Sequence, residues 1–124
     1  MSHAHIDLVE RFVAALEAGD LEALNRCFAA DAQIWHNFDQ VDASPEQNAT
    51  SVRFFFKNFT RRQYRQRQIM LLEGGALLQF VVSLEKADGR AFDWPGCVVF
   101  KMADGKIVRL QEYVDLSSLA AAMG

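Results

Sequence analysis

Three pairs of turn residues divide the second half of the chain at regular intervals. Gly74-Gly75, Asp88-Gly89 and Asp104-Gly105 lie about 15 residues apart, with strand-length segments between them. Glycine at such positions adopts the positive φ angles of tight hairpin turns, which join neighbouring antiparallel strands. The spacing therefore predicts four long antiparallel strands, over approximately residues 64–73, 76–86, 91–102 and 106–114.

The first half of the chain begins with helical periodicity. Apolar residues recur at helical spacing up to Gly19, which can adopt the left-handed conformation that ends a helix. Asp20 follows in the position of an N-cap, ahead of Leu21, Leu24 and Phe28, so a second short helix should begin at once. The repeating residues of the first helix are Ile6, Val9, Phe12, Val13 and Leu16.

A strand and a third helix complete the first half. From Ala32 onward the residues alternate in character, which places Ile34 and His36 on one face of a strand. The run Ser44-Pro45-Glu46-Gln47 combines an N-cap serine, a proline at the first helical position and a glutamine at the third. This combination is a capping box, and it predicts a helix through about Phe59.

The order of these elements predicts the fold class. It reads α-α-β-α-β-β-β-β, and Asp115 can cap a last short helix through Ala122. Because the helices are segregated from a strongly twisted sheet, the sheet should curl around them and leave a cavity at its open end. We therefore predict an α+β cone in which helices pack inside a strongly curved, mainly antiparallel sheet.

Composition favours a single soluble domain without a metal or a cofactor. The 124 residues are 51% hydrophobic and carry a net charge of −3, which suits one domain over residues 1–124. We find no apolar run of about 18 residues and no signal sequence. Cys27 and Cys97 lack CxxC spacing, which favours a reducing cytoplasm. His36 has no second histidine at ligand spacing, and phosphate loops and dinucleotide fingerprints are missing.

Three sequence features together carry a family resemblance. They are the run FVAALEAGDLEALNRCFAADAQIWHN, the hairpins that follow it, and the ending GKIVRLQEYVD. In order and spacing they resemble the nuclear transport factor 2-like superfamily, especially its SnoaL-like and ketosteroid-isomerase-related branches. The resemblance covers nearly the whole chain and implies the cone fold and a homodimer through the outer face of the sheet. It does not fix the reaction, because this fold hosts isomerases, polyketide cyclases, epoxide hydrolases, dehydratases and non-catalytic binding proteins.

The ketosteroid isomerase pattern carries over only in part. The resemblance places its general-base aspartate at His36, and its oxyanion-hole tyrosine at Phe12, which has no hydroxyl. The protonated aspartate of that hole falls near Gly96, with Asp93 close by. The resemblance therefore implies that proton transfer at His36 is retained while the oxyanion hole is largely lost. Steroid isomerisation by that mechanism is not expected.

His36 and Glu112 are the predicted catalytic pair. A histidine, with an ordinary pKa near 6.5, can accept a proton at neutral pH. Glu112 lies between two apolar residues on the predicted inner face of the last strand, where an unpaired carboxylate would be costly. We predict that Glu112 pairs with His36 and orients it or acts as the acid. The alternatives are a structural hydrogen bond for His36, and a buried ion pair of Glu112 with Arg65 or Arg67.

The predicted ligand is a small, largely apolar, carbonyl-bearing or cyclic metabolite in the cavity of the cone. If His36 and Glu112 approach a shared open space, an enzyme is favoured, whereas mutual burial without space favours a structural pair. The alternative function is a non-catalytic small-molecule-binding or interaction domain of the same fold. The expected substrate-binding residues are Phe12, Phe28, Ile34, Asn37, Arg65, Phe80, Asp93, Val98, Phe100 and Leu110.

A cluster of basic residues raises the question of nucleic acid. Six of the 13 basic residues fall between Arg53 and Arg67, beside several phenylalanines. The phenylalanines instead have the spacing of a buried helix face, the overall charge is negative, and a run of charged residues is usually solvated surface, so nucleic-acid binding is not expected. If it occurred, retention would be salt-sensitive and weakened by substitution of Arg61 and Arg62.

Overall fold

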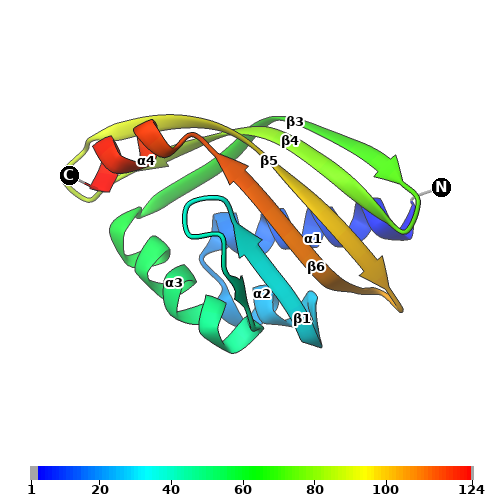
Figure 1. Ribbon diagram of the computed structural model, residues 1–124. Helices are drawn as coiled ribbons and strands as arrows, with labels where there is room; N and C mark the ends of the chain where they lie inside the picture. The colour runs from blue at the N-terminus through cyan, green and yellow to red at the C-terminus, as the bar shows by residue number, and fades with distance from the viewer. Residues whose placement is uncertain (1–2, 124) are drawn as a thin grey trace.

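The computed structural model describes residues 3–123 (Figure 1). The expected domain of residues 1–124 also includes Met1, Ser2 and Gly124, which lie outside the described residues. Among the described residues, no helix has the length and apolar character needed to cross a membrane. The elements in chain order are α1 (Ala4–Ala18), α2 (Leu21–Arg26), β1 (Phe28–His36), β2 (Asp42–Ala43), α3 (Pro45–Asn58), β3 (Arg61–Leu72), β4 (Gly75–Glu85), β5 (Ala91–Ala103), β6 (Lys106–Val114) and α4 (Leu116–Met123).

The helix boundaries follow the capping residues of the sequence. α1 ends at Gly19, whose φ of 69° is left-handed, and the side chain of Asp20 accepts a hydrogen bond from the amide of Ala23 at the start of α2. At α3 the Ser44 hydroxyl accepts from the Gln47 amide at 3.1 Å, and the Gln47 side chain accepts from the Ser44 amide at 2.9 Å. Both halves of the predicted capping box are therefore formed.

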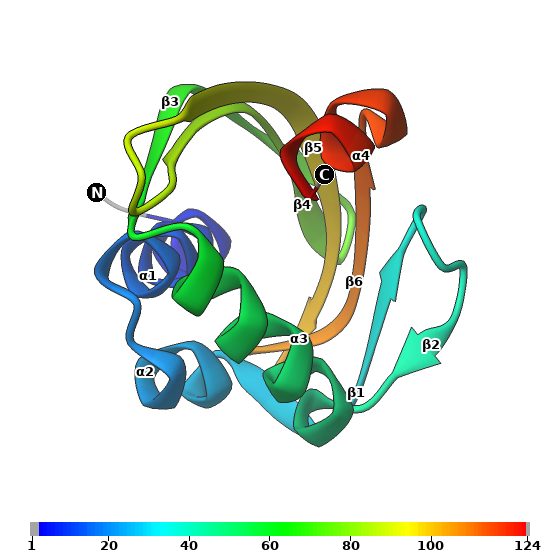
Figure 2. The ribbon, with the colours of Figure 1, turned by 90° about the vertical axis from the view of Figure 1, so that its left-hand side faces the viewer.

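The six strands form one curved sheet in the order β2-β1-β6-β5-β4-β3. β1 and β6 run parallel, and every other neighbouring pair is antiparallel. Figures 1 and 2 show the sheet curving over α1, α2 and α3, which lie on its concave side. The prediction of an α+β fold with a curved, mainly antiparallel sheet is confirmed, and the parallel pair brings two distant segments of the chain together.

Two strand boundaries differ from the prediction, and one strand was not predicted. β1 begins at Phe28, whose spacing predicts the second helix, because α2 ends at Arg26 and the chain turns at Cys27. β3 begins at Arg61 rather than near Tyr64. The two-residue strand β2 was not predicted, because it exists only through its pairing with β1. Its length gives too few residues for a recognisable alternation.

Arg62 joins the helices to the first long strand from inside the protein. Its Nε donates to the carbonyl of Leu16 at 2.6 Å, its Nη2 to that of Glu17 at 3.4 Å, and its Nη1 to that of Phe59. The guanidinium also lies 4.5 Å from the ring centroid of Phe56. Burial lowers the pKa of Arg62. Arg62 therefore satisfies the last carbonyls of α1 and the carbonyl that follows α3, and it is not part of a basic surface.

Candidate active site

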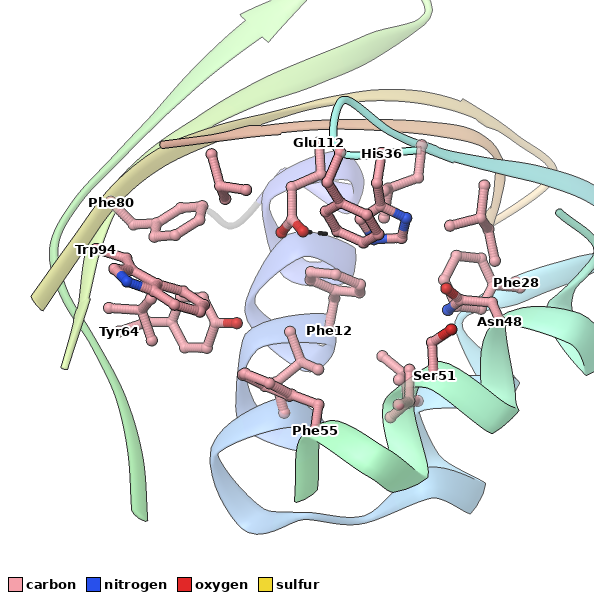
Figure 3. A pocket seen from close by; sticks show the side chains of 18 residues that line it. Phe12, Phe28, His36, Asn48, Ser51, Phe55, Tyr64, Phe80, Trp94 and Glu112 are labelled. Carbon is pink, nitrogen blue, oxygen red and sulfur yellow. Dashed lines mark ion pairs between the residues drawn. The ribbon is translucent and has the colours of Figure 1, made fainter. Parts of the chain in front are cut away.

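His36 and Glu112 face each other across the parallel strands β1 and β6. The two residues are direct partners in the register of this pair, which places their side chains on the same inner face. His36 Nε2 lies 3.4 Å from Glu112 Oε1, and the two side chains are 18% and 21% exposed (Figure 3). This distance suits an ion pair but is long for a hydrogen bond, as is common in active sites without substrate. The predicted pair is therefore present in the structure.

Asn37 fixes the relative position of these two strands at the site. Its backbone amide donates to the carbonyl of Glu112 at 3.0 Å. Its side-chain amide donates to the carbonyl of Val114 at 2.9 Å and accepts from the amide of Val114 at 3.1 Å. The side chain thus replaces a strand backbone at the end of the ladder and does not line the pocket. Our expectation that Asn37 binds substrate is not supported by this geometry, which gives it a positioning role instead.

Burial dominates the electrostatics of the pair. Removal from water raises the pKa of Glu112, and nearby His36 lowers it in part. Burial also raises the pKa of Tyr64, and the negative charge of Glu112 acts in the same direction. Tyr64 is therefore a neutral hydroxyl over the whole physiological range. Its ring lies across the pocket from Glu112, with the hydroxyl pointing into the space between them (Figure 3).

The raised pKa of Glu112 has a consequence for stability. The native state binds the proton of Glu112 more tightly than the unfolded chain does, so the free energy of unfolding decreases as pH rises from the ordinary glutamate pKa to the raised native pKa. We expect Glu112→Gln, which stays neutral, to be more stable than the parent at about pH 8 and equally stable at about pH 4. Urea unfolding at both pH values measures this difference, with the exposed Glu73→Gln as control. A variant less stable than the parent at the higher pH would show that ionised Glu112 is stabilising.

The pair opens into an apolar cavity of about 140 Å³. The ring of Phe38, which follows β1, stacks on the imidazole of His36 with a centroid separation of 4.7 Å and an interplanar angle of 21°. Because both members of the pair line this space, they satisfy the condition that favours an enzyme over a structural pair. The cavity is lined by Phe12, Leu16, Leu24, Phe28, Ile34, His36, Phe38, Asn48, Ser51, Val52, Phe55, Tyr64, Phe80, Val82, Trp94, Leu110, Glu112 and Val114.

Five of the expected apolar contacts lie at the cavity and two do not. Phe12, Phe28, Ile34, Phe80 and Leu110 line it as expected. Val98 and Phe100 instead belong to the core beneath the lining, each with 1% exposure. The ring of Phe100 packs edge-on against Phe12 at 5.2 Å, so Phe12 separates it from the cavity. These two residues support the wall without forming it.

Arg65 and Asp93 lie outside the cavity, contrary to our expectation. Arg65 Nη2 is 3.4 Å from Asp93 Oδ1, and Ser83 also donates to this carboxylate, at 2.7 Å. Arg67 pairs with Glu10 at 2.9 Å, so neither arginine reaches Glu112. The reason is the register of β3: Arg62 and Tyr64 point inward, which turns Arg65 outward. A bulge after Arg65 then shifts the register for the remainder of the strand.

Several residues of the site were not predicted from the sequence. Tyr64 and Trp94 lie within the strands predicted over 64–73 and 91–102, but neither was assigned to the inner face. The face of α3 could have been found from its spacing. Asn48, Ser51, Val52 and Phe55 follow the i, i+3, i+4, i+7 pattern of a single helix face, although two of the four are polar.

The described residues do not form a recognisable metal-binding cluster. Within residues 3–123, no group of three or more histidine, cysteine, aspartate or glutamate side chains is arranged to hold an ion. His36 and Glu112 alone would supply two ligands, and a tetrahedral zinc site takes at least three from the protein. The arrangement can instead exchange a proton between two side chains and a molecule in the cavity.

Comparison with known proteins identifies both a family and a fold. The family model of the SnoaL-like domain matches residues 9–110. A candidate polyketide cyclase from Xanthomonas campestris is 21% identical, with a TM-score of 0.84 over 98% of this chain and 97% of that one. IdmH from Streptomyces antibioticus, another candidate polyketide cyclase, is 20% identical, with a TM-score of 0.85 over 98% and 99%. A protein from Catenulispora acidiphila with a ketosteroid isomerase-like fold is 18% identical, with a TM-score of 0.81 over 94% and 91%. At these identities the solved structures show a common fold.

Proposed function

The chain belongs to the SnoaL-like domain family, and on that premise we propose that its cavity is the active site of a cofactor-independent enzyme. The enzyme moves a proton on a small, largely apolar metabolite, as part of an isomerisation, a cyclisation or a hydrolysis. One observation carries the proposal: His36 and Glu112 meet at 3.4 Å on the wall of an open apolar cavity. The candidate polyketide cyclases among the structural neighbours support the same class of chemistry.

In the proposed mechanism His36 is the base. Nε2 faces Glu112, so when the hydrogen between them resides on Nε2, Nδ1 keeps the lone pair that accepts a proton from substrate. The C–H bond next to a substrate carbonyl breaks, its proton goes to the imidazole, and its electron pair forms an enolate. Glu112 orients the ring and balances the charge of the imidazolium. Return of the proton to carbon or oxygen completes the transfer.

Tyr64 is the proposed donor to the enolate oxygen. Phe12 occupies the position where the isomerase pattern has a tyrosine, and it lines the cavity without a hydroxyl. Tyr64 supplies a hydroxyl from β3, on another wall of the same cavity. Its raised pKa keeps it protonated, as a hydrogen-bond donor must be. The site therefore favours carbonyl-bearing substrates without reproducing the ketosteroid isomerase arrangement.

Proton exchange at carbon tests the proposed function without knowledge of the natural substrate. We use 4-hydroxycyclohexanone in D₂O and follow the loss of its α-protons by NMR, while saturation-transfer NMR on the same samples reports binding. The expected result is exchange faster than in buffer or with an unrelated protein of equal concentration. Binding without accelerated exchange would instead support the alternative function, a non-catalytic small-molecule-binding domain.

We also propose a homodimer that forms through the outer face of the sheet. Trp35 and Tyr113 lie side by side there, with ring centroids 5.2 Å apart, and Tyr113 is 41% exposed. Half-exposed aromatic residues of this kind are enriched at protein interfaces. We expect a mass of about two 14.0 kDa chains by sedimentation, and a monomer for Tyr113→Arg. Phe54→Arg, at an exposed position on α3, serves as control and should remain a dimer. A monomeric parent would contradict the proposal.

A cytoplasmic location completes the proposal. Cys27 and Cys97 are both free thiols. Free cysteines are typical of reducing compartments. Fractionation of cells that express the protein at its natural level would test this, and recovery from an oxidising compartment would contradict it.

A further inference from the structure

Asn48 is a buried polar residue whose side chain has no partner in the protein. It lies on α3, is 9% exposed, and lines the cavity. Its backbone amide donates to the carbonyl of Ser44, but its side-chain amide takes part in none of the hydrogen bonds found among residues 3–123. Among the described residues, the side-chain polar atom that is fully buried without a partner is Trp94 Nε1, so the amide of Asn48 keeps access to the cavity. Polar groups inside proteins are almost always hydrogen-bonded, and a molecule in the cavity can bond this amide. The structure of the chain alone therefore does not explain why asparagine occupies this position.

Ser51 places a second polar group beside Asn48. It lies one helical turn further along α3 and also lines the cavity. Figure 3 shows the amide of Asn48 and the hydroxyl of Ser51 pointing into the space that His36 borders. Val52 and Phe55 continue the same helix face with apolar side chains. The polar groups of the cavity thus form two separate sets, one on the sheet and one on α3.

The size and charge of the cavity restrict what can contact both sets. Its volume of about 140 Å³ is close to that of the roughly 150 Å³ engineered cavity that binds benzene. The enclosed part therefore holds about one six-membered ring. No lysine or arginine occurs among the described lining residues, whereas Glu112 does. An anionic ligand would lack a countercharge, so a neutral one is favoured.

We infer that Asn48, together with Ser51, forms a second polar subsite that binds a hydroxyl or carbonyl oxygen of a neutral, single-ring ligand. This inference rests on the proposed function, in which another oxygen of the ligand faces His36 and Glu112. A side-chain amide offers both a donor and an acceptor, so it can bind either oxygen group. The ligand class is therefore a compact ring with two oxygen functions, one at the reacting carbonyl and one at α3.

A matched pair of probes tests the subsite by binding alone. Cyclohexanone and 4-hydroxycyclohexanone differ by one hydroxyl, and their dissociation constants are measured by NMR titration. We expect the parent protein to bind the hydroxyketone about three- to tenfold more tightly, the effect of about one hydrogen bond. Asn48→Leu should reduce this ratio to about one with cyclohexanone binding unchanged, and Ser51→Ala should reduce it in part. Asn58→Leu, on the same helix but outside the lining, should keep the ratio of the parent.

The thermal stability of Asn48→Leu distinguishes a ligand-binding role of Asn48 from a structural role. Asn48→Leu removes an unpartnered amide, so its thermal unfolding temperature should equal or exceed that of the parent. A structural asparagine would lower that temperature when replaced. Should the leucine variant fail to fold, Asn48 is structural and the inference is wrong, a conclusion that Asn48→Ala would check.

Each remaining outcome is also decisive. The inference is overturned if the parent binds both rings equally, if Asn48→Leu keeps the preference, or if neither ring binds. The proposed function fails separately, when the hydroxyketone binds with the expected preference but exchanges its α-protons no faster than in buffer. Binding and exchange thus give independent answers for the subsite and for the chemistry.

Discussion

Replacement of His36 with glutamine is expected to slow enzyme-promoted α-proton exchange by about 10²- to 10⁴-fold, the usual contribution of a positioned general base. Glutamine retains hydrogen-bonding capacity next to Glu112, but it cannot accept a proton near neutral pH. In the proposed mechanism His36 accepts the substrate proton, and Glu112, which also lines the cavity, orients the imidazole. The measurement is the exchange of 4-hydroxycyclohexanone by the purified variant, compared with the parent at equal concentration.

The control for this variant is its fold and its affinity for the probe. His36 is at the end of β1, and the strand pairing there is held by Asn37 and not by the imidazole. We therefore expect the unfolding midpoint to change little, as well as the dissociation constant of 4-hydroxycyclohexanone. Full exchange activity in His36→Gln would show that the imidazole is not the base. Loss of folding would assign His36 a structural role, which was the alternative that the sequence left open.

The sequence predicted the fold well because its main signals are local. The capping box at Ser44, the left-handed Gly19 and the glycine-containing turns each fix the backbone within a few residues. These caps and turns set the ends of most helices and strands, and the apolar periodicity between them sets their type. β2 and the start of β1 depend instead on pairing between distant segments, which no short window of sequence reports.

The sequence predicted the pair at the site and five apolar residues of its wall, but not the positions of Arg65 and Asp93. His36 and Glu112 each follow from alternation on a single strand, and the family resemblance placed the two strands around one cavity. Arg65 depends on the starting residue of β3, because a shift of one residue exchanges the two faces of a strand. Gln66, with a φ of 53°, lies in the bulge of this strand. Glutamine is not a residue type that favours positive φ, so the sequence did not predict the bulge.

The role of Arg62 in stability could not be predicted from the sequence either. The cluster of basic residues suggests a solvated surface, but Arg62 is only 9% exposed. Its three carbonyl partners come from two segments that are distant in sequence, Leu16-Glu17 at the end of α1 and Phe59 after α3. Gly19 leaves the room that the guanidinium occupies: a Cβ at Gly19 would lie 2.7 Å from Arg62 Nη2. The side chain is thus built into the junction of α1, α3 and β3, which is the frame that carries Tyr64 and the helical wall of the cavity.

We expect Arg62→Met to lower the free energy of unfolding by about 3 to 5 kcal/mol, because buried carbonyls lose charged hydrogen bonds and methionine cannot replace them. Removal of a partly desolvated charge offsets some of this loss, as the lowered pKa of Arg62 indicates. The carbonyl of Phe59 loses its bond to the guanidinium, and that of Leu16 keeps only a long one, at 3.3 Å from the Gly19 amide, so the net effect is destabilising. The corresponding decrease in melting temperature is roughly 10 to 20 °C. Arg61→Met makes the same chemical change at an exposed neighbouring position and should shift stability by less than about 0.5 kcal/mol. Similar unfolding curves for the two variants would show that Arg62 does not hold the junction.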